Sequence, residues 1–259
     1  MKKLLLLSGI FALLSFNACT DESSDGGTAK VNVRMTDAPA LYDAVNIDVQ
    51  KVEFNTGNGW QSLSVITPGV YNLLNFKNGM DVLLAQATLP AGPVSQMRLV
   101  LGPNNSLVKD GMTYPLATPS AMQSGLKFNW NQTLEANGAY NVWIDFDASR
   151  SIVQQGNGTY SLKPVIRTFS ELTNGQIKGY LLPQAAKARV LVITPTNDTV
   201  ATALPNIADG YYMVQGLNAG TYKVTFDADP TTGYLDQTQN NVNVVFGQVN
   251  NLGTTTLTQ

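Results

Sequence analysis

The stretch GYYMVQGLNAGTYKVTF, residues 210–226, alternates apolar and polar side chains on either side of a central turn. Tyr212 and Val214 share one face of the first segment, and Val224 and Phe226 share one face of the second. Alternation with a period of two is typical of half-buried β-strands, and the glycines between the segments let the chain reverse. The stretch therefore predicts two consecutive strands of a small β-sandwich.

The same period of two continues through most of the chain before this stretch. Val45, Ile47 and Val49 share one face, but Val52 and Phe54 continue in the other register. A β-bulge near residues 50–51 would produce such a change of phase. Further strand candidates are QMRLVLG, SLVKDGMTYPL, LKFNW, AYNVWIDF and YSLKPVIRTF.

Turn and helix signals divide the chain further. Asp110–Gly111 is expected to form a two-residue hairpin turn. Only NGMDVLLAQATL (78–89) and ASRSIVQQ (148–155) look briefly helical. The polar stretch ELTNGQ (171–176) is a natural boundary between two β-rich domains. The sequence therefore predicts a mainly β protein built as two β-sandwich domains.

Composition excludes most kinds of catalysis. The 259 residues include no histidine and one cysteine, so histidine-dependent nucleophilic catalysis, disulfides and His- or Cys-ligated metal sites have no basis. The net charge is −2 and no Lys/Arg-rich segment appears, which argues against a nucleic-acid partner. A glycosidase with paired carboxylates needs no histidine, but no separate acid in an apolar setting is visible. We expect a protein that is not an enzyme.

The lone cysteine follows a short export signal. Lys2 and Lys3 precede the apolar residues 4–16, and Ala18 stands directly before Cys19. This arrangement resembles the lipobox of bacterial lipoproteins, which implies cleavage after residue 18 and a membrane anchor on lipidated Cys19. An ordinary signal peptide with a free thiol and an uncleaved anchor are the alternatives.

The segment after Cys19 predicts where the protein is displayed. TDESSDGG (20–27) has the composition of a flexible tether, which we extend over residues 19–28. It also resembles the acidic signal that sends some lipoproteins to the outer face of the cell. We therefore expect a protein anchored in the outer membrane and facing outward.

Two family resemblances cover the rest of the chain. GQIKGYLLP (175–183), the Gly-Leu-x-x-Gly-x-Tyr motif of Gly216 to Tyr222, and NVNVVFGQVNNLGTTTL (241–257) resemble carboxypeptidase regulatory-like domains. That resemblance implies a seven-stranded Greek-key sandwich of prealbumin (transthyretin) type at residues 173–259. Its relatives include carbohydrate-binding modules, although a fold alone does not establish sugar binding.

The first half has its own resemblance. VRMTDAPA (33–40), KDGMTYPLATPSAMQSGLKF (109–128), DFDASRSIV (145–153) and YSLKPVIR (160–167) resemble domain-of-unknown-function family 4382, found in bacterial surface lipoproteins. The resemblance assigns residues 29–172 to one β-rich domain, and it implies no known activity or site residues.

One strand carries the candidate binding residues. Asn141, Trp143, Asp145 and Asp147 lie on the polar face of AYNVWIDFD, where an indole flanked by an amide and carboxylates could hold a sugar. In the other interpretation, Trp143 packs under a loop or helix and Asp147 caps the following turn. Asp145 and Asp147, with Asp37, are also candidate Ca²⁺ ligands, the one cofactor that we consider.

The remaining tryptophans and Asp37 have structural interpretations. Trp60 and Trp130 are expected in the core, and Asp37 is expected to bond nearby backbone amides in a TDAP turn. The function that we expect is a non-catalytic surface module that binds polysaccharide or glycan. The alternative is a structural accessory subunit that docks to another outer-membrane or surface protein.

Overall fold

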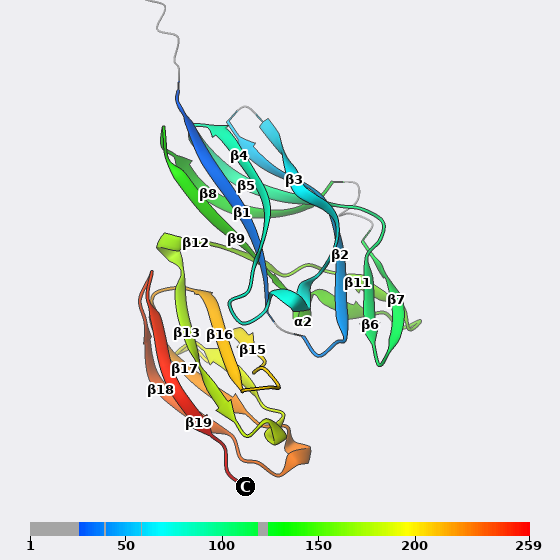
Figure 1. The fold of residues 1–259 in the computed structure, drawn as a ribbon, viewed down its shortest axis with the longest axis vertical. Helices are drawn as coiled ribbons and strands as arrows, with labels where there is room; N and C mark the ends of the chain where they lie inside the picture. The colour runs from blue at the N-terminus through cyan, green and yellow to red at the C-terminus, as the bar shows by residue number, and fades with distance from the viewer. Residues whose placement is uncertain (1–25, 39, 58, 119–123) are drawn as a thin grey trace, which may run out of the picture.

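The computed structural model describes residues 26–38, 40–57, 59–118 and 124–259, and it is mainly β as predicted. The expected signal peptide, Cys19 and most of the tether lie outside these residues. Figure 1 shows two β-rich halves stacked end to end along the long axis.

The first half is one continuous sheet that folds over on itself. Twelve strands of the described chain join in the order β10-β11-β7-β6-β2-β3-β4-β1-β9-β12, and β5 links β2 to β8. Their bounds are β1 (Thr28–Ala38), β2 (Ala44–Thr56), β3 (Gly59–Asn72), β4 (Val82–Pro90), β5 (Gly92–Leu101), β6 (Ser106–Lys109), β7 (Met112–Ala117), β8 (Leu126–Leu134), β9 (Ala139–Asp147), β10 (Ile152–Gln154), β11 (Tyr160–Leu162) and β12 (Ile166–Ser170). A 3-10 helix, η1 (Leu73–Phe76), and a short helix, α2 (Ala148–Ser151), interrupt them.

The two layers of this sheet enclose a single hydrophobic core. β1 runs parallel to β9 and antiparallel to β4, and its Val31, Val33 and Met35 are fully buried. Phe54 from β2 packs edge-on against Trp130 from β8, with ring centroids 5.3 Å apart. Trp130 is thus buried, as its position in line with Leu126 and Phe128 predicted.

Two local predictions are confirmed in detail. The register of β2 against both β3 and β5 shifts between Val49 and Lys51, where the phase of the apolar residues changes. Asp110 and Gly111 both have positive φ, 52° and 70°, and connect β6 to β7. Asp and Gly tolerate this left-handed backbone, which a tight hairpin with two such residues requires.

The helix prediction for residues 78–89 is wrong, and the one for residues 148–155 is confirmed over its first half. Residues 82–90 form strand β4, which pairs with β1 over eight residue pairs, so tertiary pairing outweighs the helical propensity of Leu, Ala and Gln. In 148–155, only Ala148–Ser151 is helical, and β10 follows directly.

The second half, residues 173–259, is described throughout and contains seven strands in two sheets. One sheet has the order β16-β13-β19 and the other β15-β14-β17-β18. The strands are β13 (Gly175–Leu182), β14 (Arg189–Ile193), β15 (Thr199–Ala203), β16 (Tyr211–Leu217), β17 (Gly220–Asp227), β18 (Gln237–Val244) and β19 (Val249–Thr256). Short 3-10 helices are η2 (Glu171–Thr173), η3 (Gln184–Ala186) and η4 (Pro230–Thr232).

The opening stretch occupies β16 and β17, which lie in opposite sheets of this sandwich. Tyr212, Val214, Val224 and Phe226 all point into the core between the sheets, as the alternation predicted. Gly216, at φ 69°, ends β16 and leaves room for Phe169 of β12, because a Cβ there would lie 2.4 Å from the phenyl ring. The turn that closes the sandwich therefore also receives a side chain from the first half.

Polar side chains join the two halves. The side chain of Asn78 donates to the carbonyl of Leu204 and to Oδ1 of Asn206, at 3.0 and 2.9 Å. Its own oxygen accepts the backbone N–H of Met213 at 3.3 Å. Because Met213 lies on β16, an edge strand, Asn78 occupies backbone groups that an added strand would otherwise pair with.

Candidate functional site

Strand β9 places the predicted binding residues on the face turned away from the first core. Val142, Ile144 and Phe146 are fully buried, and the alternating side chains of Asn141, Trp143 and Asp147 are only partly buried. Asn141 accepts a hydrogen bond from Asn32 and donates one to Glu171, both at 2.9 Å. The predicted alternation is therefore present, and the polar face of β9 is already engaged with its neighbours.

Trp143 is held by other side chains of the protein. Its ring stacks on Phe169 of β12 with centroids 5.5 Å apart and an interplanar angle of 4°. Its Nε1 donates to Oδ2 of Asp81 at 2.8 Å, while Oδ1 of Asp81 accepts from Arg34 at 2.5 Å. One ring face and the indole N–H are thus used in internal contacts.

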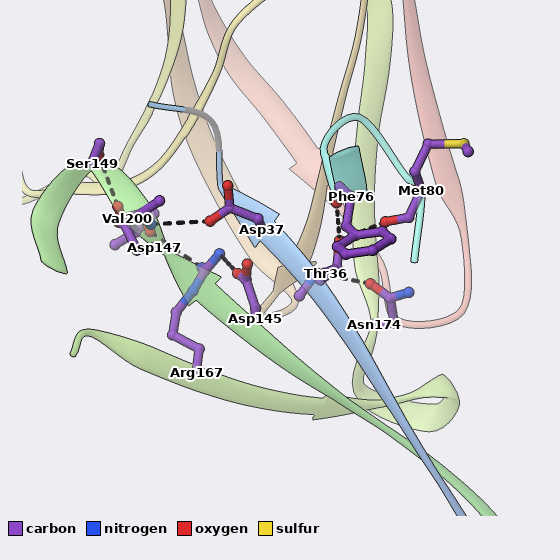
Figure 2. A network of polar contacts seen from close by, with 12 residues as sticks. Thr36, Asp37, Phe76, Met80, Asp145, Asp147, Ser149, Arg167, Asn174 and Val200 are labelled. Carbon is purple, nitrogen blue, oxygen red and sulfur yellow. Dashed lines mark hydrogen bonds and ion pairs between the residues drawn. The ribbon is translucent and has the colours of Figure 1, made fainter. Parts of the chain in front are cut away.

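Asp145 forms a buried ion pair at the junction of the halves (Figure 2). Its side chain is 6% exposed, that of Arg167 is 33% exposed, and Nη1 of Arg167 also donates to the carbonyl of Val200 at 3.2 Å. Burial raises the pKa of Asp145, and the guanidinium of Arg167 offsets part of that rise. The carboxylate therefore neutralises a cation of its own chain.

Asp37 is the neighbour of this pair and lacks a second partner. Its Oδ1 accepts the backbone N–H of Ala148 at 3.0 Å, and its Oδ2 is buried without a hydrogen-bond partner among the described residues. The TDAP prediction named the wrong partner, because the parallel pairing of β1 with β9 brings distant α2 to the end of β1. Burial raises the pKa of Asp37 well above its usual value.

A small cavity adjoins these carboxyl groups. Asp37, Asp145 and Arg167 line it from the first half, and Met213 and Gln215 line it from the second. Its volume is about 20 Å³, enough for roughly one water molecule and too small for a sugar ring. The junction is therefore a packed contact with no space for an organic ligand.

Asp147 serves as a helix cap. Its Oδ1 accepts the backbone N–H of Arg150 at 3.0 Å and the hydroxyl of Ser149 at 2.8 Å, as the capping interpretation predicted. Across the part of the chain that the structure describes, no group of three or more Asp, Glu, His or Cys side chains is arranged to hold a metal ion. The structure brings Asp37, Asp145 and Asp147 near one another but commits each carboxylate to protein partners.

A different surface carries a partly exposed aromatic side chain, Trp60. We define the Trp60 face as the outer side of β3, β2, β5 and β8, where paired residues stand side by side across four strands. Its members are partly or fully exposed, and they are Trp60, Ser62, Glu53, Asn55, Gln96, Arg98, Lys127 and Asn129. Two rows cross the strands, Trp60–Asn55–Gln96–Asn129 and Ser62–Glu53–Arg98–Lys127.

The expectation that Trp60 lies in the core is wrong, because of strand parity. Leu63 and Val65 of β3 are buried, so the even-numbered residues from Trp60 to Ser64 point outward. The alternation in WQSLSV contains this information, and reading it from Leu63 backward would have placed Trp60 outside. No local signal shows that Arg98 and Lys127 would lie beside it.

Charged groups surround the indole. The guanidinium carbon of Arg98 lies 4.2 Å from the ring centroid of Trp60, and Nζ of Lys127 lies 5.9 Å from it. Arg98 also pairs through Nε with Glu53, whose side chain is 12% exposed. Cation–π attraction of this kind favours the position of both cations over the ring face.

The second half contains a larger open groove. Its volume is about 230 Å³, and its lining includes Thr194, Asn197, Tyr222, Lys223 and Asn240. Nζ of Lys223 donates to Oδ1 of Asn197 at 3.2 Å, and the Tyr222 ring is buried. The groove therefore offers polar groups without an exposed aromatic ring.

No helix within the described ranges is long and apolar enough to cross a membrane. No curated protein matches the chain. Among solved structures, the chain is similar to the Bacillus anthracis TIE protein, at 11% identity and a TM-score of 0.25 over 90% of this chain and 34% of the other. It thus spans about a third of that protein.

Two pilins are similar to the same extent. The minor pilin GBS52 of Streptococcus agalactiae is 8% identical with a TM-score of 0.25, covering 90% of this chain and 97% of the pilin. The major pilin BcpA of Bacillus cereus is 9% identical with a TM-score of 0.23, covering 89% and 70%. Likeness at this level carries no functional argument.

The sequence of the first half gives the firmer assignment. Residues 28–164 match the model of the domain of unknown function DUF4382. The matched segment contains β1 to β11, the Trp60 face and the polar side of β9. Because it makes up more than half of the 259 residues, the chain belongs to the DUF4382 family.

Proposed function

We propose that this protein is a non-catalytic, lipid-anchored module that displays a polysaccharide-binding surface outside the cell. The observation that carries the binding role is the Trp60 face, where an indole is surrounded by amide, hydroxyl and charged side chains across four strands. Apolar C–H faces of sugars pack on aromatic rings, and amides and hydroxyls bind their polar groups. Asn141, Trp143, Asp145 and Asp147 support this role less well, since they are held in contacts within the protein.

The non-catalytic part rests on where the carboxyl groups lie. A paired-carboxylate hydrolase needs two such groups facing a cleft that admits a sugar. Asp37 and Asp145 face a cavity of about 20 Å³ instead. The carboxylate of Asp145 is also held in an ion pair with Arg167. We therefore propose that the chain binds polysaccharide without cleaving it.

The anchor rests on Cys19 and the segment around it. A diacylated cysteine would hold the protein durably at a membrane, since each buried CH₂ contributes about 0.8 kcal/mol. Incorporation of labelled fatty acid into the full chain, and its loss in Cys19→Ala, would support the anchor. Unchanged labelling in the variant would refute it, and protease treatment of intact cells reports whether the protein faces outward.

A polysaccharide panel tests the binding role. The protein would be a form spanning residues 20–259, which keeps every residue that the structure describes. Saturable binding that is lost in Trp60→Ala and kept in Trp143→Phe supports the proposal. Failure to bind any member of a broad panel, with the tryptophan fluorescence of the folded protein intact, contradicts it.

A second candidate is a docking subunit for another surface protein. The observation in its favour is an apolar patch at the turn between β18 and β19, where Val245 and Phe246 of the turn and Val249 at the start of β19 are 40–45% exposed. The turn is fixed by a hydrogen bond from Gly247 N to Asn174 O at 3.1 Å. Phe246→Ser would weaken capture of a surface protein in this case and would leave polysaccharide binding unchanged.

A further inference from the structure

The Trp60 face has a charge opposite to that of the whole protein. Arg98 and Lys127 of this face stand against one acid, Glu53, which gives a local charge of +1, and the exposed Lys51 of β2 beside the face adds a third positive side chain. The full chain has a net charge of −2. A local excess of cations around a ring attracts anionic ligands and repels cationic ones.

The cations of this face keep donors for a ligand. Arg98 uses Nε for Glu53, and its two Nη groups make no hydrogen bond to the described residues. Lys127 is exposed and contacts the indole at 5.9 Å without a hydrogen bond to that part of the chain. Guanidinium and ammonium groups bind carboxylate and sulfate oxygens through charge-assisted hydrogen bonds.

The spacing of the face suits an extended chain more than a single small anion. Adjacent strands lie about 4.8 Å apart, so the four strands from β3 to β8 span roughly 14 Å across the rows. Trp60 stands at one end of a row, and Gln96 and Asn129 stand at the other, joined by a hydrogen bond of 3.3 Å. This span matches several linked sugar rings.

From these observations we infer that the Trp60 face binds acidic polysaccharide. The indole of Trp60 lies against a sugar ring, and Arg98 and Lys127 bind carboxylate or sulfate groups of the same chain. This inference rests on the proposed polysaccharide-binding function and adds the class of ligand and the residues that select it. Acidic polypeptides carry negative charge without a sugar ring for the indole to contact. Oligonucleotides carry furanose rings and bases that can stack on an indole, so they are included in the test as competitors.

Polygalacturonate and its methyl ester provide the test. They share one sugar backbone, and only the first carries free carboxylates. Residues 20–259 should bind polygalacturonate at least about tenfold more tightly than the ester, and the difference should shrink at high salt as the charges are screened. Dextran sulfate beside dextran repeats the comparison for sulfate and shows which anion is preferred.

Three variants locate the site. Lys127→Gln should weaken polygalacturonate binding by about tenfold, and Trp60→Ala should weaken both polygalacturonate and its ester. Lys223→Gln is the matched control, because it removes a partly buried lysine from the groove of the second half. Lys127 is preferred to Arg98 as the target because it forms no ion pair with the described residues, whereas Arg98 is paired with Glu53.

The outcomes separate this inference from the proposed function. Equal affinity for polygalacturonate and its ester would overturn the inference and leave polysaccharide binding in place. Loss of binding in Lys223→Gln but not in Lys127→Gln would move the site to the second half and also overturn it. Tighter binding of polyglutamate or of an oligonucleotide than of polygalacturonate would replace sugar recognition by simple charge attraction. Absence of binding to every polysaccharide would contradict the proposed function itself.

Discussion

Replacing Arg167 with methionine removes the cation that neutralises buried Asp145 at the junction. The aliphatic part of the side chain is retained, and the hydrogen bond to the carbonyl of Val200 is lost. Breaking a buried ion pair costs about 3–5 kcal/mol, but Arg167 is a third exposed, so solvent screening lowers the expected cost to about 2–3 kcal/mol. The lost hydrogen bond adds about 1 kcal/mol. We expect a loss of about 3–4 kcal/mol at neutral pH.

The loss should depend on pH in a defined direction. Burial already raises the pKa of Asp145 in the folded protein, and removing the guanidinium raises it further. A carboxyl group whose folded-state pKa lies above its unfolded value near 3.9 destabilises the fold as pH rises through that folded-state pKa. Arg167→Met should therefore lose more stability at about pH 7.5 than at about pH 5.

Urea unfolding followed by tryptophan fluorescence measures this effect. Trp60, Trp130 and Trp143 all lie in the first half, so the signal reports unfolding of that half alone. In thermal unfolding followed by the same signal, the melting temperature should fall by about 6–16 °C, since each kcal/mol corresponds to about 2–4 °C in a protein of this size. The double variant Asp145→Asn/Arg167→Met should recover most of the loss.

Two results would refute this reasoning. A loss below about 1 kcal/mol would mean that the pair behaves like an exposed one. A loss of equal size at both pH values would mean that the carboxylate of Asp145 is not the group left uncompensated. Arg189→Met, measured by circular dichroism, is the control, because the pair of Arg189 with Asp227 is 53% and 25% exposed.

Three further predictions concern the same region. Asp37→Asn should leave stability unchanged at about pH 4 and raise it by about 1–2 kcal/mol at about pH 8, because the amide carries no buried charge. Thermal unfolding at the two pH values measures this, and equal effects at both would contradict it. Trp143→Phe should keep the stack on Phe169, lose the bond to Asp81, lower stability by about 1–2 kcal/mol in urea unfolding, and leave polysaccharide affinity unchanged. Gly216→Ala should lower the free energy of unfolding by at least about 1 kcal/mol, and so lower the melting temperature more than a surface substitution does. The reason is that its Cβ would lie 2.4 Å from the ring of Phe169 and that its φ is 69°. An unchanged melting temperature would show that this turn rearranges freely.

The mainly β class could be predicted because the information is local. Buried and exposed positions alternate along a strand, so Tyr212 and Val214, or Val45 and Ile47, show which face is buried without reference to distant residues. The bulge in β2 was visible for the same reason, since it shifts the phase of this alternation. The turn at Asp110–Gly111 depends only on the backbone that those two residues tolerate.

The sequence alone thus determined the strands, the turn and bulge chemistry, and the absence of histidine chemistry. Tertiary structure decided what depends on pairing between distant segments. Residues 82–90 became a strand because β1 offered a partner, and Asp37 bonded Ala148 because β1 lies parallel to β9. Trp60, Arg98 and Lys127 meet only because β3, β2, β5 and β8 are neighbours in the sheet, and inter-strand order is set by long-range packing that no short stretch of sequence contains.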